Sequence, residues 1–143
     1  MDRLPTFLSL PFVEKKCFLE AVILIIVFRV CVRTFPYKYI ARALEALWRG
    51  HSSRKLDSHP DVGLVKVSLR RAEGVFRSPR LCLPMSMAAF VMLQRRGIPA
   101  LVILGVRRSS SEGMMAHAWI EIQSKSYFAA EDIAEFTPVG KIG

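Results

Sequence analysis

Apolar side chains recur at helical spacing through the first two thirds of the chain and form strand-like runs after that. The helical spacing predicts helices over residues 11–34, 37–48, 62–77 and 81–96. Phe35 ends the first helix, because a residue before proline disfavours the α region. Gly50 and Gly97 are predicted to end the second and fourth helices, and Asp61 to cap the third.

The β-branched run at residues 98–106 predicts a buried strand, and residues 115–122 and 126–130 predict two more. We expect a flexible loop at 107–113, a turn at 123–125, and an irregular or briefly helical tail to residue 143. Helices followed by antiparallel strands are typical of the α+β class. A chain of 143 residues can bury a core, so we expect one domain over 1–143, with N-terminal helices in 1–50.

The first predicted helix contains an uninterrupted apolar run at residues 21–28, between Glu20 and Arg29. As a helix, this run spans about 12 Å, which is well short of the roughly 30 Å core of a bilayer. The helix is apolar nearly all round, so we expect it to be mostly buried. Peripheral contact with a membrane surface is the alternative.

Positive charge is concentrated in the larger part of the chain. The net charge is +9, and residues 1–111 carry 19 basic and 7 acidic side chains. Such a basic body favours an acidic peptide, an anionic membrane or nucleic acid as a partner, or serves solubility alone. The basic residues are scattered, and no basic helix is interleaved with aromatic side chains, so we expect no nucleic-acid partner.

The three cysteines, Cys17, Cys31 and Cys82, match no zinc or disulfide spacing. An odd number of cysteines without a framework indicates a reducing compartment, so we expect a cytoplasmic protein. His51 and His59 lie in a polar stretch with no metal-ligand pattern around them. We therefore expect neither a metal nor another cofactor.

Cys82 opens the fourth predicted helix, where the helix dipole and unpaired backbone N–H groups favour a reactive thiolate. The same N–H groups can stabilise the oxyanion of a tetrahedral intermediate. His117 lies within a predicted strand between two alanines, which leave its ring room, and Trp119 shields one side of it. A cysteine nucleophile needs such a base, so Cys82 and His117 are a candidate catalytic pair, although His117 could equally be a core histidine bonded to a carbonyl.

The segments R-L-C-L-P-M-S-M-A, L-Q-R-R-G-I-P-A-L-V-I-L-G-V-R and A-H-A-W-I-E-I resemble the lasso-peptide leader peptidases. These are stand-alone B2-type biosynthesis proteins of the transglutaminase-like, papain-related cysteine proteases. The resemblance covers roughly residues 62–138, including D-I-A-E-F-T-P, and it implies a peptidase core there, with a Cys-bearing helix packed on a small antiparallel sheet. The helix ahead of T-F-P-Y-K-Y-I-A-R is similar to the N-terminal region of that family.

The resemblance implies that Cys82 is the nucleophile and His117 the general base and acid. The reaction would remove the leader from a ribosomally made precursor peptide through a thioester acyl-enzyme. A separate leader-recognition protein would present the leader, and a separate macrolactam cyclase would close the ring. No cofactor is implied.

The acid that completes such a site departs from the family pattern. The family has an Asp about a dozen residues after the histidine, where this chain has Ala129, and the preceding turn, Q-S-K, lacks glycine. A hairpin centred near Ser124 would bring residues around 131 opposite His117, so Asp132 is the expected third residue and Glu131 the alternative. A dyad with no acid, or a side-chain amide in place of the acid, is a further alternative. Glu121 lies about 13 Å along the strand from His117, too far to orient the ring.

Two other functions are compatible with these residues. One is a non-catalytic, basic module that binds a peptide or a membrane surface, which the charge, the apolar first helix and the displaced acid favour. The other is a transglutaminase-like acyl transferase, because the same acyl-enzyme can pass its acyl group to an amine instead of water.

Overall fold

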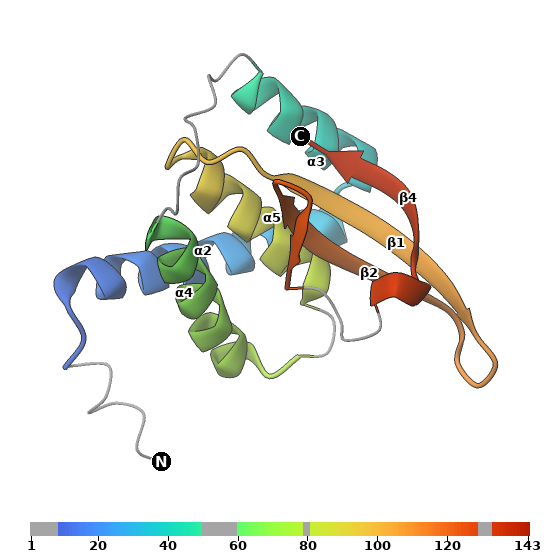
Figure 1. Cartoon of the computed structure of the whole chain (residues 1–143), viewed down its shortest axis with the longest axis horizontal. Helices are drawn as coiled ribbons and strands as arrows, with labels where there is room; N and C mark the ends of the chain where they lie inside the picture. Colours follow the sequence, from blue (N-terminus) through green and yellow to red (C-terminus); the bar gives the residue numbers. More distant parts are fainter. Residues whose placement is uncertain (1–8, 50–59, 79–80, 129–132) are drawn as a thin grey trace.

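The computed structural model describes residues 9–49, 60–78, 81–128 and 133–143. The described chain confirms the α+β class, with helices first and a small antiparallel sheet after them (Figure 1). The elements in order are α2 (Phe12–Thr34), α3 (Tyr37–Trp48), α4 (Pro60–Phe76), α5 (Cys82–Gln94), β1 (Leu101–Ser109), β2 (Gly113–Ile122), β3 (Lys125–Tyr127), the 3-10 helix η1 (Ile133–Glu135) and β4 (Thr137–Ile142).

The proline and glycine signals end the helices as predicted. Phe35 is extended, at φ −119° and ψ 144°, and its N–H donates to the carbonyl of Cys31 at 2.8 Å. Gly97 follows α5 with φ +73°, a left-handed conformation that glycine adopts without a steric penalty. Gly50, His51 and His59 lie outside the described residues. Asp61 lies in the first turn of α4, which begins one residue earlier, at Pro60, so the prediction that Asp61 is its cap was wrong.

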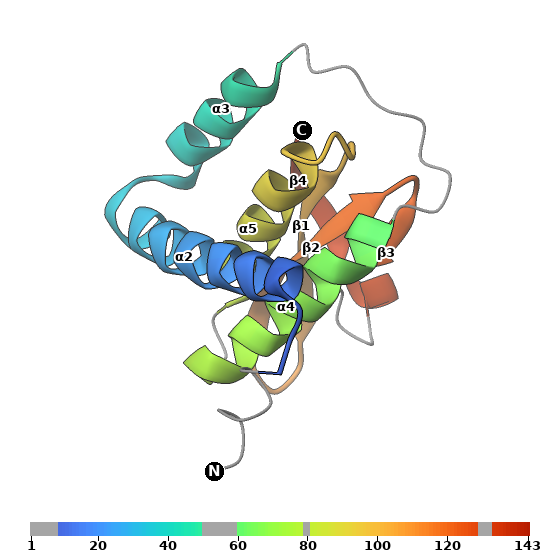
Figure 2. The same cartoon turned by 90° about the vertical axis from the view of Figure 1, so that its left-hand side faces the viewer.

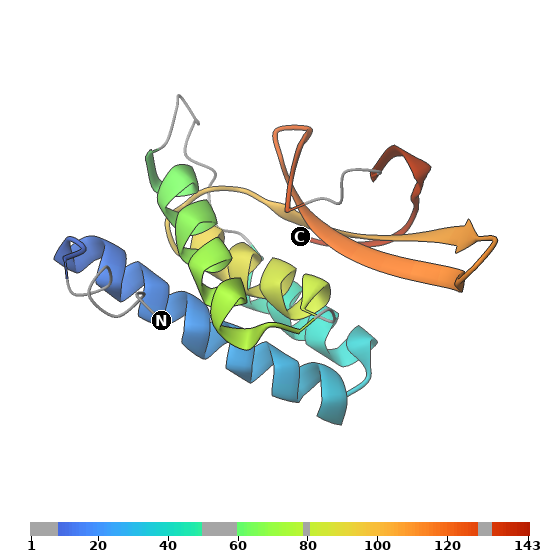
Figure 3. The same ribbon diagram turned by 90° about the horizontal axis from the view of Figure 1, so that it is seen from below.

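Helix α5 lies at the centre of the molecule. It packs against α2 and α4 on one side and against β1 and β2 on the other (Figures 2 and 3). Every residue of α5 from 84 to 93 is buried, and the large side chains among them include Met87, Phe90, Met92 and Leu93. The sheet contributes Val102, Ile120, Ile122 and Ile142 to the same core cluster, so a single apolar interior joins the helices to the sheet.

The sheet has the order β3-β2-β1-β4, and each strand pair is antiparallel. β1 has the predicted length but lies three residues later in the chain, and β2 begins two residues earlier than predicted. Only residues 110–112 therefore remain between them, and the loop predicted at 107–113 was wrong. The predicted strand at 126–130 is shorter, because β3 ends at Tyr127, and residues 129 and 130 lie outside the described chain. The tail contains the short helix that was predicted, η1. It also contains β4, which was not predicted and which pairs with β1 from Val102↔Ile142 to Val106↔Thr137.

Helix α2 buries one face only, which corrects the expectation that it is mostly buried. Its buried residues are Cys17, Ala21, Ile25 and Phe28, all within one stripe of the helix. The opposite face carries Ile23, which is 59 % exposed, and four similar aliphatic residues described below. In the described chain no helix is both long enough and apolar enough to cross a membrane.

This one-sided burial predicts unequal effects of two matched substitutions in α2. Ile25→Ala should lower the free energy of unfolding by about 2–5 kcal/mol, because Ile25 is fully buried and its loss leaves a cavity. Ile23→Ala should change it by less than about 0.5 kcal/mol, because that side chain faces water. Denaturant unfolding followed by circular dichroism measures both, and equal losses would contradict the assigned orientation of α2.

Gly105 leaves the space that the side chains of Trp119 and Phe136 occupy on one face of the sheet. It pairs with His117 across β1 and β2, and a Cβ at position 105 would lie 2.7 Å from the Trp119 ring and 3.1 Å from Phe136 Cβ. The contact with Trp119 is closer than carbon atoms tolerate and the one with Phe136 is tight, so any side chain there must displace the indole.

Gly105→Ala is therefore expected to destabilise the protein by about 1–3 kcal/mol and to shift the tryptophan fluorescence. Gly63→Ala is the matched control, because a Cβ there meets nothing within 4 Å and alanine is the better helix former. That control should be neutral or stabilising by up to about 1 kcal/mol. A Gly105→Ala protein as stable as the wild type would contradict the close packing of Trp119.

Candidate functional site

Cys82 is the first residue of α5 and is half-buried. The first intrahelical bond runs from the N–H of Met85 to the carbonyl of Leu81 at 2.8 Å. Pro84 has no N–H, and the side chain of Leu81 makes no capping bond. The N–H groups of Cys82 and Leu83 therefore have no acceptor within the helix, and they lie beside the thiol at the positive end of the helix dipole.

His117 lies in β2, and its ring is held among aromatic side chains. The ring stacks with Trp119 at a centroid distance of 6.5 Å and an interplanar angle of 17°. Phe136 approaches it at 5.8 Å and 50°. His117 Nε2 lies 3.4 Å from the carbonyl oxygen of Phe128, and when that nitrogen carries the proton it donates to this carbonyl. The ring thus has apolar neighbours and one long backbone contact.

The relation between Cys82 and His117 follows from the alternation of side chains along β2. Ile120 and Ile122 belong to the core that α5 shares with the sheet, whereas Trp119 belongs to a separate cluster with Ile103 and Phe136. The His117 ring stacks on Trp119, so it lies on the face of β2 turned away from the helices. Within the described chain no hydrogen bond joins Cys82 to His117.

The expected third catalytic residue, Asp132, and its alternative, Glu131, lie outside the described residues. The described chain stops just before them at Phe128, which adopts a left-handed φ of +59°. In the pairing of β2 with β3, Ile120 lies opposite Tyr127. Glu121 pairs with Ser126 and is half-buried, and by alternation it shares the His117 face of the strand.

The other two thiols differ from Cys82 in their surroundings. Cys17 is 2 % exposed, and burial raises the pKa of its thiol although the Arg96 guanidinium, which lies 3.6 Å from Sγ, acts in the opposite direction. A raised pKa leaves less thiolate at neutral pH, so Cys17 is a poor nucleophile. Cys31 is half-buried near the end of α2.

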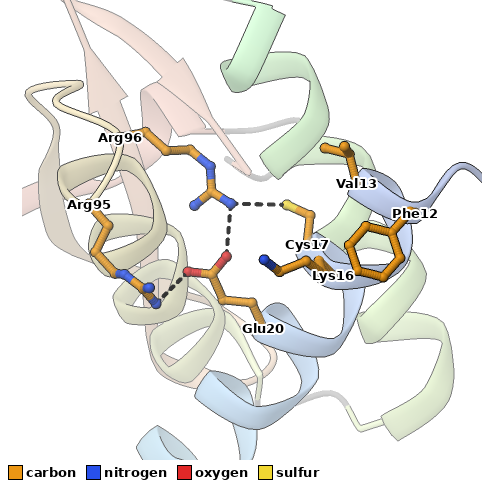
Figure 4. Close-up of a pocket in the computed structure, with 7 residues that line it drawn as sticks. All are labelled: Phe12, Val13, Lys16, Cys17, Glu20, Arg95 and Arg96. Atoms are coloured by element: carbon orange, nitrogen blue, oxygen red, sulfur yellow. Dashed lines mark hydrogen bonds and ion pairs between the residues drawn. The ribbon is translucent and has the colours of Figure 1, made fainter.

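A cavity of about 500 Å³ lies between the start of α2 and the end of α5, away from Cys82 (Figure 4). In it Glu20 accepts one hydrogen bond from Arg95 and one from Arg96, each at 2.8 Å. Burial alone would lower the pKa of Arg96, but the hydrogen bond and the charge of Glu20 raise it. The remaining lining residues are Phe12, Val13, Lys16 and Cys17.

Sequence reasoning missed this charge cluster, because Glu20 and the two arginines are about 75 positions apart and no motif links them. Only the packing of α2 on α5 brings them together. Across the described ranges, no group of His, Cys, Asp and Glu side chains is arranged to hold a metal ion.

Comparison with known proteins bears on the whole domain rather than on single residues. The model of the transglutaminase-like superfamily matches residues 14–141. Comparison with curated proteins and with solved structures gives no match. The matched region runs from the first turn of α2 to the last residues of β4 and so includes both Cys82 and His117. The chain belongs to the transglutaminase-like superfamily.

Proposed function

We propose that the protein is a cysteine peptidase that removes the leader from a ribosomally made lasso precursor peptide. The observation that carries this proposal is the position of Cys82 at the uncapped N-terminus of α5 within a transglutaminase-like domain. The superfamily includes cysteine peptidases and acyltransferases, and both use a thiolate to form an acyl-enzyme. The likeness of the Cys82 and His117 segments to leader peptidases supports the choice of substrate.

In the proposed reaction, His117 removes the proton from the Cys82 thiol, and Sγ attacks the carbonyl carbon at the leader–core junction. The N–H groups of Cys82 and Leu83 stabilise the oxyanion. The C–N bond then breaks, and His117 gives its proton to the amine of the released core peptide. Water, deprotonated by His117, hydrolyses the thioester, which frees the leader carboxylate and restores the thiol.

This chemistry requires β2 and α5 to shift when the precursor binds, so that the His117 ring, which lies on the sheet face turned away from α5, can reach Cys82. In the free protein the ring contacts the Phe128 carbonyl instead, by a long 3.4 Å interaction that costs little to break. Catalytic hydrogen bonds are often long or misaligned before substrate binds and tighten in the complex. Asp132, or Glu131 in its place, would orient the imidazole. If neither carboxylate does so, Cys82 and His117 act as a dyad, or a side-chain amide orients the ring.

The proposal includes a separate leader-recognition protein and a macrolactam cyclase as partners. The second candidate is a non-catalytic, basic peptide-binding or membrane-surface module. It is favoured by the position of His117 on the sheet face turned away from α5. A third candidate, acyl transfer to an amine, shares the acyl-enzyme and differs only in the acceptor.

Removal of either proposed catalytic group should abolish leader cleavage. Cys82→Ala and His117→Ala are each expected to lower the rate by more than about a thousandfold, because nucleophile and base act as a unit. Cys31→Ala, which removes a half-buried thiol elsewhere, should retain the rate within about twofold. The assay follows purified precursor and leader-recognition protein by mass spectrometry.

Cleavage at the wild-type rate by Cys82→Ala would end the peptidase proposal. A product that carries an added amine in place of a free leader carboxylate would instead identify an acyl transferase. Circular dichroism of each variant separates loss of activity from loss of fold.

Thiol labelling tests the activation of Cys82 without any substrate. Near neutral pH an alkylating reagent should modify Cys82 at least about tenfold faster than Cys17, whose thiol pKa is raised by burial. The fast phase should disappear in Cys82→Ser, and all three thiols should react alike in denaturant. Uniformly slow labelling of the folded protein would contradict an activated thiolate and favour the non-catalytic module.

A further inference from the structure

The outward face of α2 is an uninterrupted aliphatic surface. Its side chains recur at i, i+4, i+7, i+8 and i+11, which places them on one side of the helix, and each is between 45 and 59 % exposed. We call this set the outer stripe: Leu19, Ile23, Ile26, Val27 and Val30. Figure 3 shows α2 along the border of the helical layer farthest from the sheet. An exposed patch of this kind marks an interaction surface.

The acidic residues of α2 do not lie free beside this stripe. Glu14 pairs with Arg71 of α4 at 2.8 Å, and Glu20 pairs with Arg95 and Arg96, which directly follow α5, also at 2.8 Å. Both carboxylates are therefore neutralised against the body of the protein. The helix has no other acidic residue.

Basic residues lie at both ends of the outer stripe. Lys16 is exposed one turn before it, and Arg33 is exposed one turn after it. Lys38 and Arg42, both exposed, continue the positive charge into α3. The surface thus combines a central apolar stripe with cationic ends, which is the pattern of a helix that lies flat in the interface of an anionic membrane.

A second copy of the chain fits this surface less well. The protein carries a net charge of +9, and antiparallel pairing of two outer stripes would bring Lys16 of one copy near Arg33 of the other. Like charges repel in such a contact, whereas anionic headgroups attract the same residues.

We propose that the outer stripe of α2 docks the protein on the surface of an anionic phospholipid membrane. The five aliphatic side chains enter the boundary between headgroups and acyl chains, and Lys16 and Arg33 contact lipid phosphates. This inference does not depend on leader cleavage, because it uses neither Cys82 nor His117.

The test is co-sedimentation of the full chain with vesicles. One set contains phosphatidylcholine alone, and the other contains phosphatidylcholine and phosphatidylglycerol in equal parts. The wild type should bind the mixed vesicles at least about tenfold more tightly than the neutral ones, and added salt should weaken this binding.

Two single substitutions separate the stripe from general surface hydrophobicity. Ile23→Glu should weaken binding to the mixed vesicles by at least about tenfold, because it removes an inserted side chain and adds a repelled charge. Val139→Glu is the matched control on β4: the charge change is the same, and Val139 is 62 % exposed against 59 % for Ile23. The control should bind as the wild type does within about twofold. Circular dichroism checks that both variants are folded.

A pair of double substitutions separates the cationic ends from net charge. The double variant Lys16→Gln/Arg33→Gln should bind the mixed vesicles clearly more weakly than the control double variant Arg108→Gln/Lys125→Gln. The control removes the same amount of charge, but from exposed residues of the sheet. Equal losses would mean diffuse attraction only and would overturn the proposal.

Three further outcomes would also overturn it. These are failure of the wild type to bind mixed vesicles, unchanged binding by Ile23→Glu, and a wild-type dimer in sedimentation equilibrium that Ile23→Glu dissociates. The last would assign the stripe to a second copy of the chain. Binding lost only in the stripe and Lys16/Arg33 variants would support the membrane surface.

Discussion

The burial of α5 on all sides is the constraint on which the rest of the structure depends. Residues 84 to 93 are buried without exception, and a helix with no polar face must be covered all round. Helices α2 and α4 cover one side, and β1 and β2 cover the other. Each large apolar side chain fully removed from water contributes about 1.5–3 kcal/mol, so this one helix supplies a large share of the driving force for folding. Because Cys82 is the first residue of α5, the position of this helix also fixes the position of the thiol.

The two faces of β2 have different surroundings. One face contributes Ile120 and Ile122 to the core around α5. The other carries His117 and Trp119, which pack with Phe136 over the space left by Gly105. A strand places consecutive side chains on opposite faces, so the helix-facing core and the aromatic surroundings of His117 follow from the same backbone. The proposed chemistry therefore depends on how the ring moves relative to α5 when a peptide binds.

Ion pairs orient α2 more than they stabilise it. The Glu14–Arg71 and Glu20–Arg95 pairs include well-exposed partners, and such pairs contribute roughly 0–1 kcal/mol. Packing of Cys17, Ala21, Ile25 and Phe28 holds the helix in place. The pairs turn the acidic side chains of α2 towards α4 and α5, which leaves a surface of aliphatic and basic side chains facing outward. Apolar packing thus explains the attachment of the helix, and the ion pairs explain the character of its exposed face.

The sequence by itself determined the α+β class, the span of each helix to within a few residues, and the position of Cys82 at a helix start. These features depend on local rules: apolar periodicity, the residue before proline, and glycine at positive φ. Pairing partners were harder to predict, because a strand such as β4 is stabilised by residues far away in the sequence, here those of β1. The orientation of α2 could not be predicted either. Apolar residues occur nearly all round this helix, so their spacing does not show which face is buried. Only the tertiary structure decided which stripe of α2 meets α5 and which face of β2 carries His117. It also decided that Glu20 pairs with Arg95 and Arg96. Each of these features depends on contacts between segments that are distant in the sequence.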